Sequence, residues 1–369
     1  MSRLKVSAAI ADGHGGFQLD EVEVDEPIGR ELRVSIKAAG LCHTDHASLS
    51  WKRPLLMGHE GAGIVEAVGS EVTQFKPGDA VVLNWAIPCG DCFQCQRGQA
   101  VLCEVSRPAY VMEPSAAHAH REGTLWRGQP LDRSFNLGTL SPLALVREEA
   151  ATLLPPGISF PSACIVGCGV MTGFGSAMNV ARIQPGDSVA VIGCGGVGLN
   201  VIQGARLAGA TTIIALDLHA ESLERARRFG ATDVIQTSKD SSGWDAIVAR
   251  VKALTKGRGA DFAFEATAVP ALAAAPLQLT RNGGMALQVS GINDPVTIDM
   301  PLFMWNKTYI TPLYGGCVPS RDFPRIFGHY LKGELFLDEL VTRTYRLEEL
   351  GEAFDDMLGG RLAKGVVVF

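Results

Sequence analysis

The stretch SVAVIGCGGVGLNVIQGARLAGATTIIALD, residues 188–217, decides the fold. It runs from a short apolar segment through a glycine-rich turn and a helical pattern into a second apolar segment that ends in Asp217. Glycines spaced G-x-G-x-x-G directly after a predicted strand are typical of a dinucleotide-binding turn, because the backbone can approach a pyrophosphate that faces the helix N-terminus. The candidate turn residues are Gly193, Gly195, Gly196, Val197 and Gly198.

Asp217 ends the second predicted strand of this stretch. A carboxylate at that place accepts hydrogen bonds from the ribose hydroxyls and repels a 2′-phosphate, which favours NAD over NADP. The alternative is that Asp217 only caps the helix that follows it.

Alternating strands and helices continue around this stretch, with a helix predicted at 221–230 and further strands at 233–236, 260–267 and 283–291. This alternation predicts an α/β domain with a parallel sheet. The first 80 residues instead contain short β-rich runs and turns. Residues 104–142 are expected to be irregular, with little regular structure.

The composition describes a globular protein of about two domains, with 369 residues, 47% hydrophobic and 20% charged. The net charge is −6 and no basic run stands out, so we expect neither a nucleic-acid partner nor a membrane partner. The N-terminal residues do not resemble a secretory signal. Nine cysteines are too sparse for a disulfide scaffold, which favours a reducing, cytoplasmic location.

Four cysteines lie within PCGDCFQCQRGQAVLC, residues 88–103: Cys89, Cys92, Cys95 and Cys103. Four thiolates in one short loop can form the closed tetrahedral shell of a structural zinc ion. An iron–sulfur cluster is the main alternative, since ferredoxins use similar spacings. A disulfide pair fits poorly with a reducing compartment.

A catalytic zinc ion needs three protein ligands and an open fourth position. Cys42, His59 and Cys168 are candidates, although each taken alone could be a buried cysteine or a turn histidine. Five motifs now become informative together: GLCHTDH, GHEGAGIVEAVG, the four-cysteine run, GCGVMTGFGSA and GCGGVG. Their order and approximate spacing resemble those of the zinc-dependent medium-chain alcohol dehydrogenases, over nearly the whole chain.

The resemblance implies a GroES-like β-rich catalytic domain at 1–169 and 314–369, with a structural-zinc lobe at about 88–104. A Rossmann NAD-binding domain, a doubly wound parallel sheet, would occupy 170–313. The expected cofactors are NAD and two zinc ions per chain, one catalytic and one structural.

The resemblance also implies roles for single residues. The catalytic zinc would be held by Cys42, His59 and Cys168. Thr44 would hold the substrate oxygen and pass on its proton, Asp45 would orient His59, and Glu60 would be the acid near the metal. Ala47 stands where many relatives have a histidine that ends the proton relay. Either the neighbouring His46 takes over this role or the relay ends in water.

The implied NAD contacts are His43 and Lys364 at the pyrophosphate, with Val197 and Thr172 at the nicotinamide. The implied substrate pocket contains Trp85, Asn136, Leu137, Ile292 and Leu313. Arg107 stands where glutathione-dependent relatives have an arginine for a glutathione carboxylate, or else is an ordinary solvated arginine. The segment from Cys42 to His59 is shorter than in many relatives, which points to an open pocket.

The expected activity is NAD-dependent interconversion of primary alcohols, aromatic or medium-chain, and their aldehydes. One alternative is a glutathione-type formaldehyde dehydrogenase in which Arg107 grips the thiol's acid group. Another is a binding protein of the same fold without activity. The long stretch after Cys103 is typical of the dimeric members, so we expect a homodimer.

Overall fold

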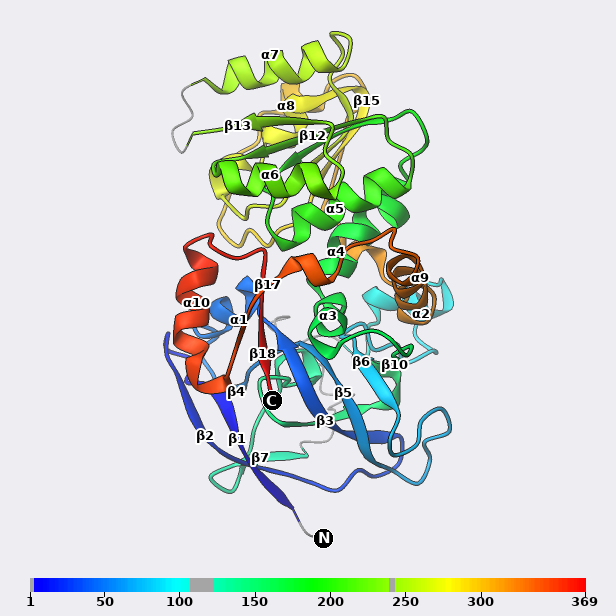
Figure 1. The fold of residues 1–369 in the computed structure, drawn as a ribbon, viewed down its shortest axis with the longest axis vertical. Helices are drawn as coiled ribbons and strands as arrows, with labels where there is room; N and C mark the ends of the chain where they lie inside the picture. The colour runs from blue at the N-terminus through cyan, green and yellow to red at the C-terminus, as the bar shows by residue number, and fades with distance from the viewer. Residues whose placement is uncertain (1–2, 107–122, 239–242) are drawn as a thin grey trace. The chain divides into compact units, whose positions relative to one another are not determined.

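The computed structural model describes residues 3–106, 123–238 and 243–369. The chain divides into two compact units (Figure 1). The first contains Met1–Cys168 and Val318–Phe369, and the second contains Gly169–Cys317. The boundaries expected from the resemblance lay after 169 and after 313.

The first unit is built on two largely antiparallel sheets. In the described residues, one sheet has the order β4-β1-β2-β7-β8 and the other β10-β6-β5-β3-β18-β17, with β9 also paired to β3. The strands are β1 Leu4–Ala11, β2 Phe17–Val24, β3 Glu31–Gly40, β4 Leu55–Leu56, β5 Glu60–Val68, β6 Ala80–Leu83, β7 Thr124–Trp126, β8 Gln129–Pro130, β9 Leu143–Arg147, β10 Ala151–Leu153, β17 Val341–Tyr345 and β18 Lys364–Val368.

Most helices described in the first unit are short, and α9, with 13 residues, is the longest of them. They are α1 His43–Ser48, α2 Phe93–Gln96, α3 Phe160–Cys164, α9 Pro319–Leu331 and α10 Leu350–Leu358. The apolar core of the first sheet includes Ile10, Val22, Val24, Leu56 and Leu145. Ile10, Val22 and Val24 share one face of the first sheet because side chains alternate along a strand, and Leu145 of β9, which pairs with β3 in the other sheet, packs into the same cluster.

The second unit is a parallel six-stranded sheet in the order β13-β12-β11-β14-β15-β16. Its strands are β11 Ser188–Ile192, β12 Thr212–Asp217, β13 Asp233–Gln236, β14 Ala260–Glu265, β15 Thr280–Gln288 and β16 Thr308–Ile310. Its helices are α4 Gly169–Gly175, continued by a π-helix at Ser176–Ala181, α5 Gly196–Leu207, α6 Ala220–Phe229, α7 Trp244–Leu254 and α8 Ala275–Leu279.

Helices cover both faces of this sheet, with α5 and α6 on one side and α7 and α8 on the other (Figure 1). The chain leaves β11 towards β12 and returns to β14 on the opposite side of β11. In such a sheet, ligands bind at the carboxyl ends of the strands on either side of this reversal. The predicted α/β fold is therefore confirmed, and the glycine turn after β11 lies at this switch point.

The expectation of an irregular segment at 104–142 is wrong for residues 124–130. Here β7 and β8 form a hairpin whose turn residues Arg127 and Gly128 both have positive φ, of 52° and 76°. Two such residues match the right-handed twist of a hairpin, but arginine rarely occupies the first of them. The sequence therefore lacked its usual turn signal.

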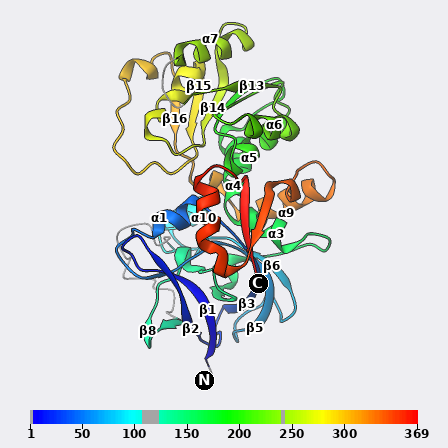
Figure 2. The same cartoon turned by 60° about the vertical axis from the view of Figure 1, so that its left-hand side comes forward.

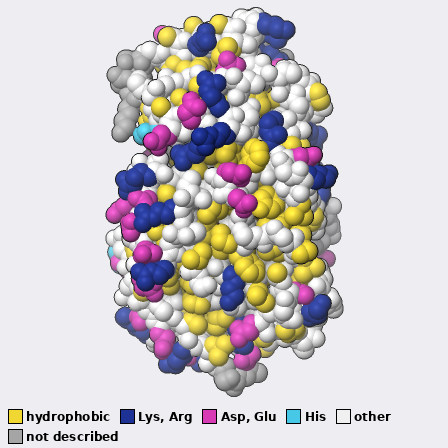
Figure 3. All heavy atoms as spheres, viewed as in Figure 1, with side chains coloured by type: hydrophobic (Ala, Val, Ile, Leu, Met, Phe, Trp, Pro, Cys, Tyr) yellow, Lys and Arg dark blue, Asp and Glu magenta, His cyan; other side chains and the backbone are white. Residues whose placement is uncertain are grey.

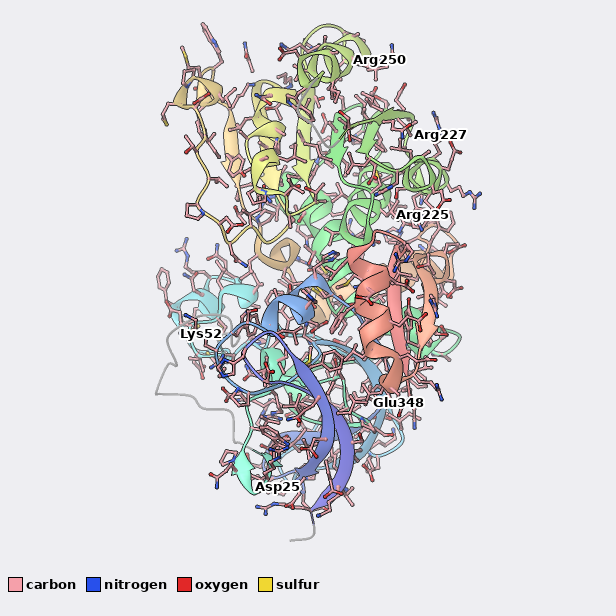
Figure 4. All side chains as sticks on the ribbon, turned by 90° about the vertical axis from the view of Figure 1, so that its left-hand side faces the viewer. Asp25, Lys52, Arg225, Arg227, Arg250 and Glu348 are labelled. Atoms are coloured by element: carbon pink, nitrogen blue, oxygen red, sulfur yellow. The ribbon has the colours of Figure 1, made fainter. Side chains whose placement is uncertain are left out.

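On the face drawn in Figure 3, basic and acidic side chains are interspersed. The basic residues labelled in Figure 4 lie in three parts of the chain, with Arg225 and Arg227 on α6, Arg250 on α7 and Lys52 in the segment after α1. Among the described residues, no single helix is long and apolar enough to span a membrane, and one bent pair, Phe160–Gly167 with Gly169–Ala181, passes that test by length and composition alone.

Candidate active site and metal centres

Four potential metal ligands of the first unit converge at the ends of its elements. The ligand atoms of Cys42, His59, Glu60 and Cys168 all lie within 4.8 Å of one another. Cys42 directly precedes α1, and His59 directly precedes β5, whose first residue is Glu60. Cys168 is the last residue before the second unit. The fold thus brings together the three ligands that the resemblance implied, with Glu60 beside them.

The imidazole of His59 is oriented as a metal ligand would be. Its Nδ1 is 2.8 Å from Asp45 Oδ1, and its Nε2 is buried without a hydrogen-bond partner. The other Asp45 oxygen, Oδ2, accepts a hydrogen bond of 3.0 Å from the backbone N–H of Cys42. Burial lowers the pKa of His59, but Asp45 outweighs it and raises this pKa well above its ordinary value. A carboxylate on the distal nitrogen fixes the tautomer and makes the ring a stronger base for zinc.

The two thiols complete a donor set of two sulfurs and one nitrogen. A hydrogen bond from the Cys168 thiol lowers the pKa of Cys42 well below its ordinary value, against the effect of burial. Two soft thiolates and one imidazole suit zinc, and three protein ligands leave a fourth position open for substrate. The unpartnered Nε2 of His59 and this donor set fit a catalytic zinc ion.

Glu60 and Lys364 form a buried ion pair next to the candidate metal site. Lys364 Nζ lies 2.7 Å from Glu60 Oε1 and donates to the carbonyl of Leu41 at 2.7 Å. The second Glu60 oxygen, Oε2, is buried without a partner. Burial raises the pKa of Glu60 to about 7 although Lys364 opposes this rise. The expected role of Lys364 at the pyrophosphate remains a prediction, because two of its three N–H donors are used within the first unit.

The side chains of α1 diverge after Cys42. Thr44 Oγ1 lies 3.7 Å from Cys42 Sγ, close to the candidate metal site, and His43 is exposed. His46 packs edge-on against Phe354, at 5.6 Å between ring centroids, where α1 lies beside α10 (Figure 2). Residues two apart on a helix do not face each other. No hydrogen bond in the described part of the chain joins His46 to Thr44, so a relay role for His46 stays an untested prediction.

Replacement of Asp45 by asparagine tests its hold on His59. An amide nitrogen cannot accept the hydrogen bond from Cys42 N–H, and a neutral amide is a weaker acceptor for His59. We expect Asp45→Asn to weaken zinc binding at this site by about 10- to 100-fold, measured by competition with a chromophoric chelator. Activity should return in part when zinc is added in excess. Wild-type zinc affinity in this variant would contradict the role given to Asp45.

The four-cysteine lobe forms a second metal-binding cluster. The sulfurs of Cys89, Cys92, Cys95 and Cys103 all lie within 4.8 Å of one another. A tetrahedral zinc ion with Zn–S bonds of about 2.3 Å places its sulfurs about 3.8 Å apart, and Cys92 Sγ and Cys103 Sγ are 4.0 Å apart. This spacing suits one metal ion and excludes a disulfide between these two residues.

Backbone N–H groups surround the sulfurs of this lobe. Cys92 N donates to Cys89 Sγ and Cys89 N donates to Cys103 Sγ, both at 3.3 Å. A hydrogen bond from the backbone of Cys95, together with one from Glu104, lowers the pKa of Cys92 to about 6. Amide donors stabilise the thiolate of Cys92, whereas burial raises the pKa of Cys95 to about 12, so these two neighbouring thiols share one deprotonated sulfur until a metal ion binds. All four predicted ligands are thus assembled in a shell with no place for substrate.

The glycine turn of the second unit is shaped for a close ligand. Gly193 has φ of 92°, and a Cβ at Gly198 would lie 1.8 Å from Gly193 O, so the chain itself requires both glycines. A Cβ at Gly195 would meet nothing within 4 Å. The space above Gly195 therefore fits the approach of a pyrophosphate at the N-terminus of α5.

The expected nicotinamide contacts lie on touching helices of this unit. A Cβ at Gly173 would lie 2.3 Å from Val197 O, so α4 and α5 are in close backbone contact there. Thr172 on α4 and Val197 on α5 are both half-buried. Their contact with a nicotinamide remains a prediction.

Asp217 is held by the backbone on two sides. Its Oδ2 accepts from Cys194 N of the glycine turn at 2.8 Å, and its Oδ1 accepts from His219 N at 2.9 Å. The carboxylate therefore does more than precede α6, because it also fixes the glycine turn. This placement at the end of β12 fits recognition of a ribose diol.

Replacement of Asp217 by serine should change the cofactor preference. The variant loses a charged acceptor for the ribose hydroxyls and the charge that repels a 2′-phosphate. We expect the ratio of kcat/KM for NAD to kcat/KM for NADP to fall by at least ~100-fold, measured from initial rates with each cofactor. Asp233→Asn, in β13, serves as the control and should leave this ratio unchanged. An unchanged ratio in Asp217→Ser would contradict the assignment.

A buried carboxylate that the sequence did not single out lies at the same edge of the sheet. Glu265 accepts from Thr267 N and from Gln288 Nε2, both at 2.6 Å, and also from the hydroxyls of Thr267 and Ser290. Thr267 and Ser290 lie in the segments that follow β14 and β15, and Gln288 is the last residue of β15. Glu265 thus ties together two loops at the switch point. Its position at the end of a predicted strand was the one feature of the sequence that could have identified Glu265 as a site residue.

The expected pocket residues fall into both units. Ile292 and Leu313 belong to the second unit, whereas Trp85, Asn136 and Leu137 belong to the first. Leu137 is fully buried, and Asn136 is half-buried with its Nδ2 lacking a hydrogen-bond partner. Arg107 lies outside the described residues.

Phe135, which the sequence reading missed, lies at the centre of an aromatic cluster next to the candidate zinc site. Its ring centroid is 4.6 Å from that of His59, 5.3 Å from that of Trp85 and 6.3 Å from that of Trp51. We call Trp51, Trp85 and Phe135 the aromatic cluster. Phe135 adjoins the predicted pocket residue Asn136, but its contact with His59 depends on a positive φ that no local signal indicated.

Comparison with known proteins identifies the family. The profile of the alcohol dehydrogenase GroES-like domain matches residues 29–156, and that of the zinc-binding dehydrogenases matches residues 196–329. Alcohol dehydrogenase B of Mycobacterium tuberculosis is 34% identical, covering 95% of this chain and 94% of its own length. S-(hydroxymethyl)glutathione dehydrogenase of Saccharomyces cerevisiae is 32% identical, covering 99% and 96%. The crystal structure of benzyl alcohol dehydrogenase from Acinetobacter calcoaceticus has a TM-score of 0.88 at 28% identity, covering 99% of each chain. The chain therefore belongs to the zinc-dependent medium-chain alcohol dehydrogenase family, whose members are oxidoreductases.

Proposed function

We propose that this protein oxidises primary arylmethanols, such as benzyl alcohol, to their aldehydes with NAD⁺ and catalyses the reverse reduction. The observation that carries this proposal is the aromatic cluster, in which Phe135 covers the ring of the ligand His59 at 4.6 Å. Flat aromatic walls next to a metal site favour a flat apolar substrate. The similarity to a benzyl alcohol dehydrogenase supports the same substrate class.

In this proposal, several residues near the candidate zinc site have a part in the reaction. A zinc ion held by Cys42, His59 and Cys168 would supply Lewis acidity. NAD⁺ bound at the glycine turn would accept the hydride. In this proposal the Thr44 hydroxyl, 3.7 Å from Cys42 Sγ, would hold the substrate oxygen and pass its proton onward to solvent. Asp45 keeps His59 in the tautomer with a free Nε2. The aromatic cluster excludes water from one side of the site.

A second candidate function is oxidation of a thiol adduct of formaldehyde. It is supported by the 32% identity to an S-(hydroxymethyl)glutathione dehydrogenase over almost the whole chain. In this alternative, Arg107 would bind a carboxylate of the thiol, as Arg–carboxylate pairs commonly do. The shorter segment between Cys42 and His59 counts against it, because that segment contributes glutathione contacts in such relatives.

One assay separates the two candidates. NADH formation by the zinc-loaded protein is measured with benzyl alcohol, with formaldehyde alone, and with formaldehyde plus glutathione. Turnover of benzyl alcohol that does not depend on thiol supports the arylmethanol proposal. Turnover only with formaldehyde plus glutathione would overturn it and make Arg107 the residue to test next.

We also propose that the protein is a homodimer in the cytoplasm. β16 is an edge strand among the described residues, and the segment before it exposes Met300, Met304 and Trp305, at 73%, 56% and 70%. An uncovered edge strand beside large apolar side chains favours pairing with a second copy. None of the nine cysteines is paired in a disulfide, which fits a reducing compartment.

Replacement of Trp305 by lysine tests the dimer proposal. A charge at the centre of an apolar interface should shift the protein to the monomer, because exposed aromatics commonly dominate such interfaces. The molar mass from light scattering after size exclusion should fall by half. Leu153→Lys, at an exposed apolar residue of the first unit, is the control and should leave the mass unchanged. A wild-type monomer would refute the proposal directly.

A further inference from the structure

The turn at Phe135 and Asn136 has an unusual backbone next to the candidate zinc site. Both residues are left-handed, with φ of 52° and 62°. Asparagine tolerates this conformation, but a bulky residue such as phenylalanine rarely adopts it. Strained residues of this kind persist where the surrounding structure enforces them, and they cluster at functional sites.

The chain on both sides of this turn is fastened to the segment that carries His59. Before the turn, Asp132 O accepts from Leu56 N at 2.8 Å. After it, Thr139 N donates to Gly58 O at 3.0 Å, and Leu140 N donates to Met57 O at 2.9 Å. These bonds set the turn against the residues immediately before His59, so the position of the Phe135 ring is coupled to that of the imidazole.

The ring of Phe135 lies over the face of the His59 imidazole. The interplanar angle is 31° and the centroid distance 4.6 Å, with side-chain exposures of 4% for Phe135 and 1% for His59. Asp45 holds the edge of the same imidazole through Nδ1. The imidazole is thus restrained at one edge by a carboxylate and on one face by an aromatic ring, while Nε2 remains free for a metal.

We propose that Phe135 is a positioning residue for the zinc ligand His59. Its strained backbone places an aromatic ring on the imidazole, which restricts rotation about the Cβ–Cγ bond and keeps Nε2 directed at the metal. Asp45 alone allows the ring to tilt about its hydrogen bond, and stacking removes this freedom. Pre-organisation lowers the ordering cost of metal binding. This role does not depend on which alcohol the enzyme uses.

The test replaces Phe135 by leucine, which keeps an apolar side chain but removes the flat ring. Zinc affinity of the full chain is measured by titration with a chromophoric chelator. The binding step that disappears in Cys168→Ser is assigned to the catalytic site. We expect the dissociation constant at that site to rise about tenfold, the lower end of the effect of removing a group that orients a ligand. When Co²⁺ replaces zinc at the catalytic site, its d–d absorption reports the ligand geometry. This absorption should also change in Phe135→Leu.

Phe354→Leu is the matched control. Phe354 has the same exposure of 4% and packs against a histidine that is not a ligand, His46, at 5.6 Å. The Phe354→Leu variant loses an equivalent aromatic side chain from the same unit, and its zinc affinity should stay within twofold of wild type. Phe135→Tyr, which keeps the ring, should restore the cobalt spectrum. If Phe135→Leu is recovered unfolded, Phe135→Met replaces it.

The outcomes separate this proposal from the proposed substrate. Equal weakening of zinc binding in Phe135→Leu and Phe354→Leu would overturn the positioning role, because general loosening of the core would then explain both. An unchanged affinity or an unchanged cobalt spectrum in Phe135→Leu would overturn it as well. Both measurements are made without substrate, so a failed benzyl alcohol assay leaves them decisive.

Discussion

Replacement of Cys168 by serine should abolish the activity and remove one of two zinc ions per chain. The Cys168 sulfur lies within 4.8 Å of the ligand atoms of Cys42 and His59, and a serine hydroxyl is a much poorer zinc ligand than a thiolate. Without the third ligand the site no longer supplies Lewis acidity to the substrate. We expect NADH formation to fall by at least ~1,000-fold, which corresponds to ~4 kcal/mol in the barrier, and zinc content by atomic absorption to fall from two to one.

Cys164→Ser is the matched control for this prediction. Cys164 is fully buried, and its thiol donates to Pro161 O at 3.2 Å, outside the ligand cluster. A serine can make the same hydrogen bond, so both zinc ions and most of the activity should remain. Retention of two zinc ions in Cys168→Ser would mean that Cys168 is not a ligand.

The features that could be predicted from the sequence depend on residues that lie close together in the chain. The expected fold, a GroES-like domain with a Rossmann domain, is confirmed by both family profiles and by the parallel sheet of the second unit. Gly193 and Gly198 were recognisable because their lack of a side chain is required by the turn itself. The cysteines of the lobe lie so close in sequence that a shared metal ion was the natural interpretation.

Long-range contacts could not be predicted in the same way. Phe135 meets His59 only because two consecutive residues adopt positive φ, and phenylalanine gives no signal for that conformation. Lys364 and Glu60 are far apart in sequence, and their contact depends on the pairing of β18 with β3 and of β3 with β5. A buried ion pair of this kind becomes visible only once the register of the sheet is known.

The short α1 helix illustrates a third limit. His46 follows Thr44 by two positions, and one expectation from the sequence was that it takes over the relay role of the histidine that many relatives have at the position of Ala47. In the structure its ring packs against Phe354 of α10. The direction of a side chain on a helix changes by about 100° per residue, so a shift of one position redirects the group completely.

Replacement of Cys95 by serine should destabilise the four-cysteine lobe and remove the other zinc ion. The lobe has little apolar packing of its own, since Phe93 is 61% exposed and Leu102 is 42% exposed. A segment with so few buried side chains depends on its metal, and structural zinc contributes directly to folding free energy. We expect zinc content to fall from two to one, the thermal midpoint to drop by at least ~5 °C, and proteolysis to cut first near residues 88–106.

Phe93→Ala distinguishes the metal from apolar packing as the source of this stability. Because the Phe93 side chain is exposed and stacks only with Arg97 among its described ring contacts, at 5.2 Å, its removal should change the thermal midpoint by less than about 2 °C. Cys95→Ser should keep its catalytic zinc, because Cys42, His59 and Cys168 are untouched, and freshly prepared protein should retain measurable turnover. A variant that keeps both zinc ions and the wild-type midpoint would show that Cys95 is not a ligand. A larger loss in Phe93→Ala than in Cys95→Ser would assign the stability of the lobe to packing instead.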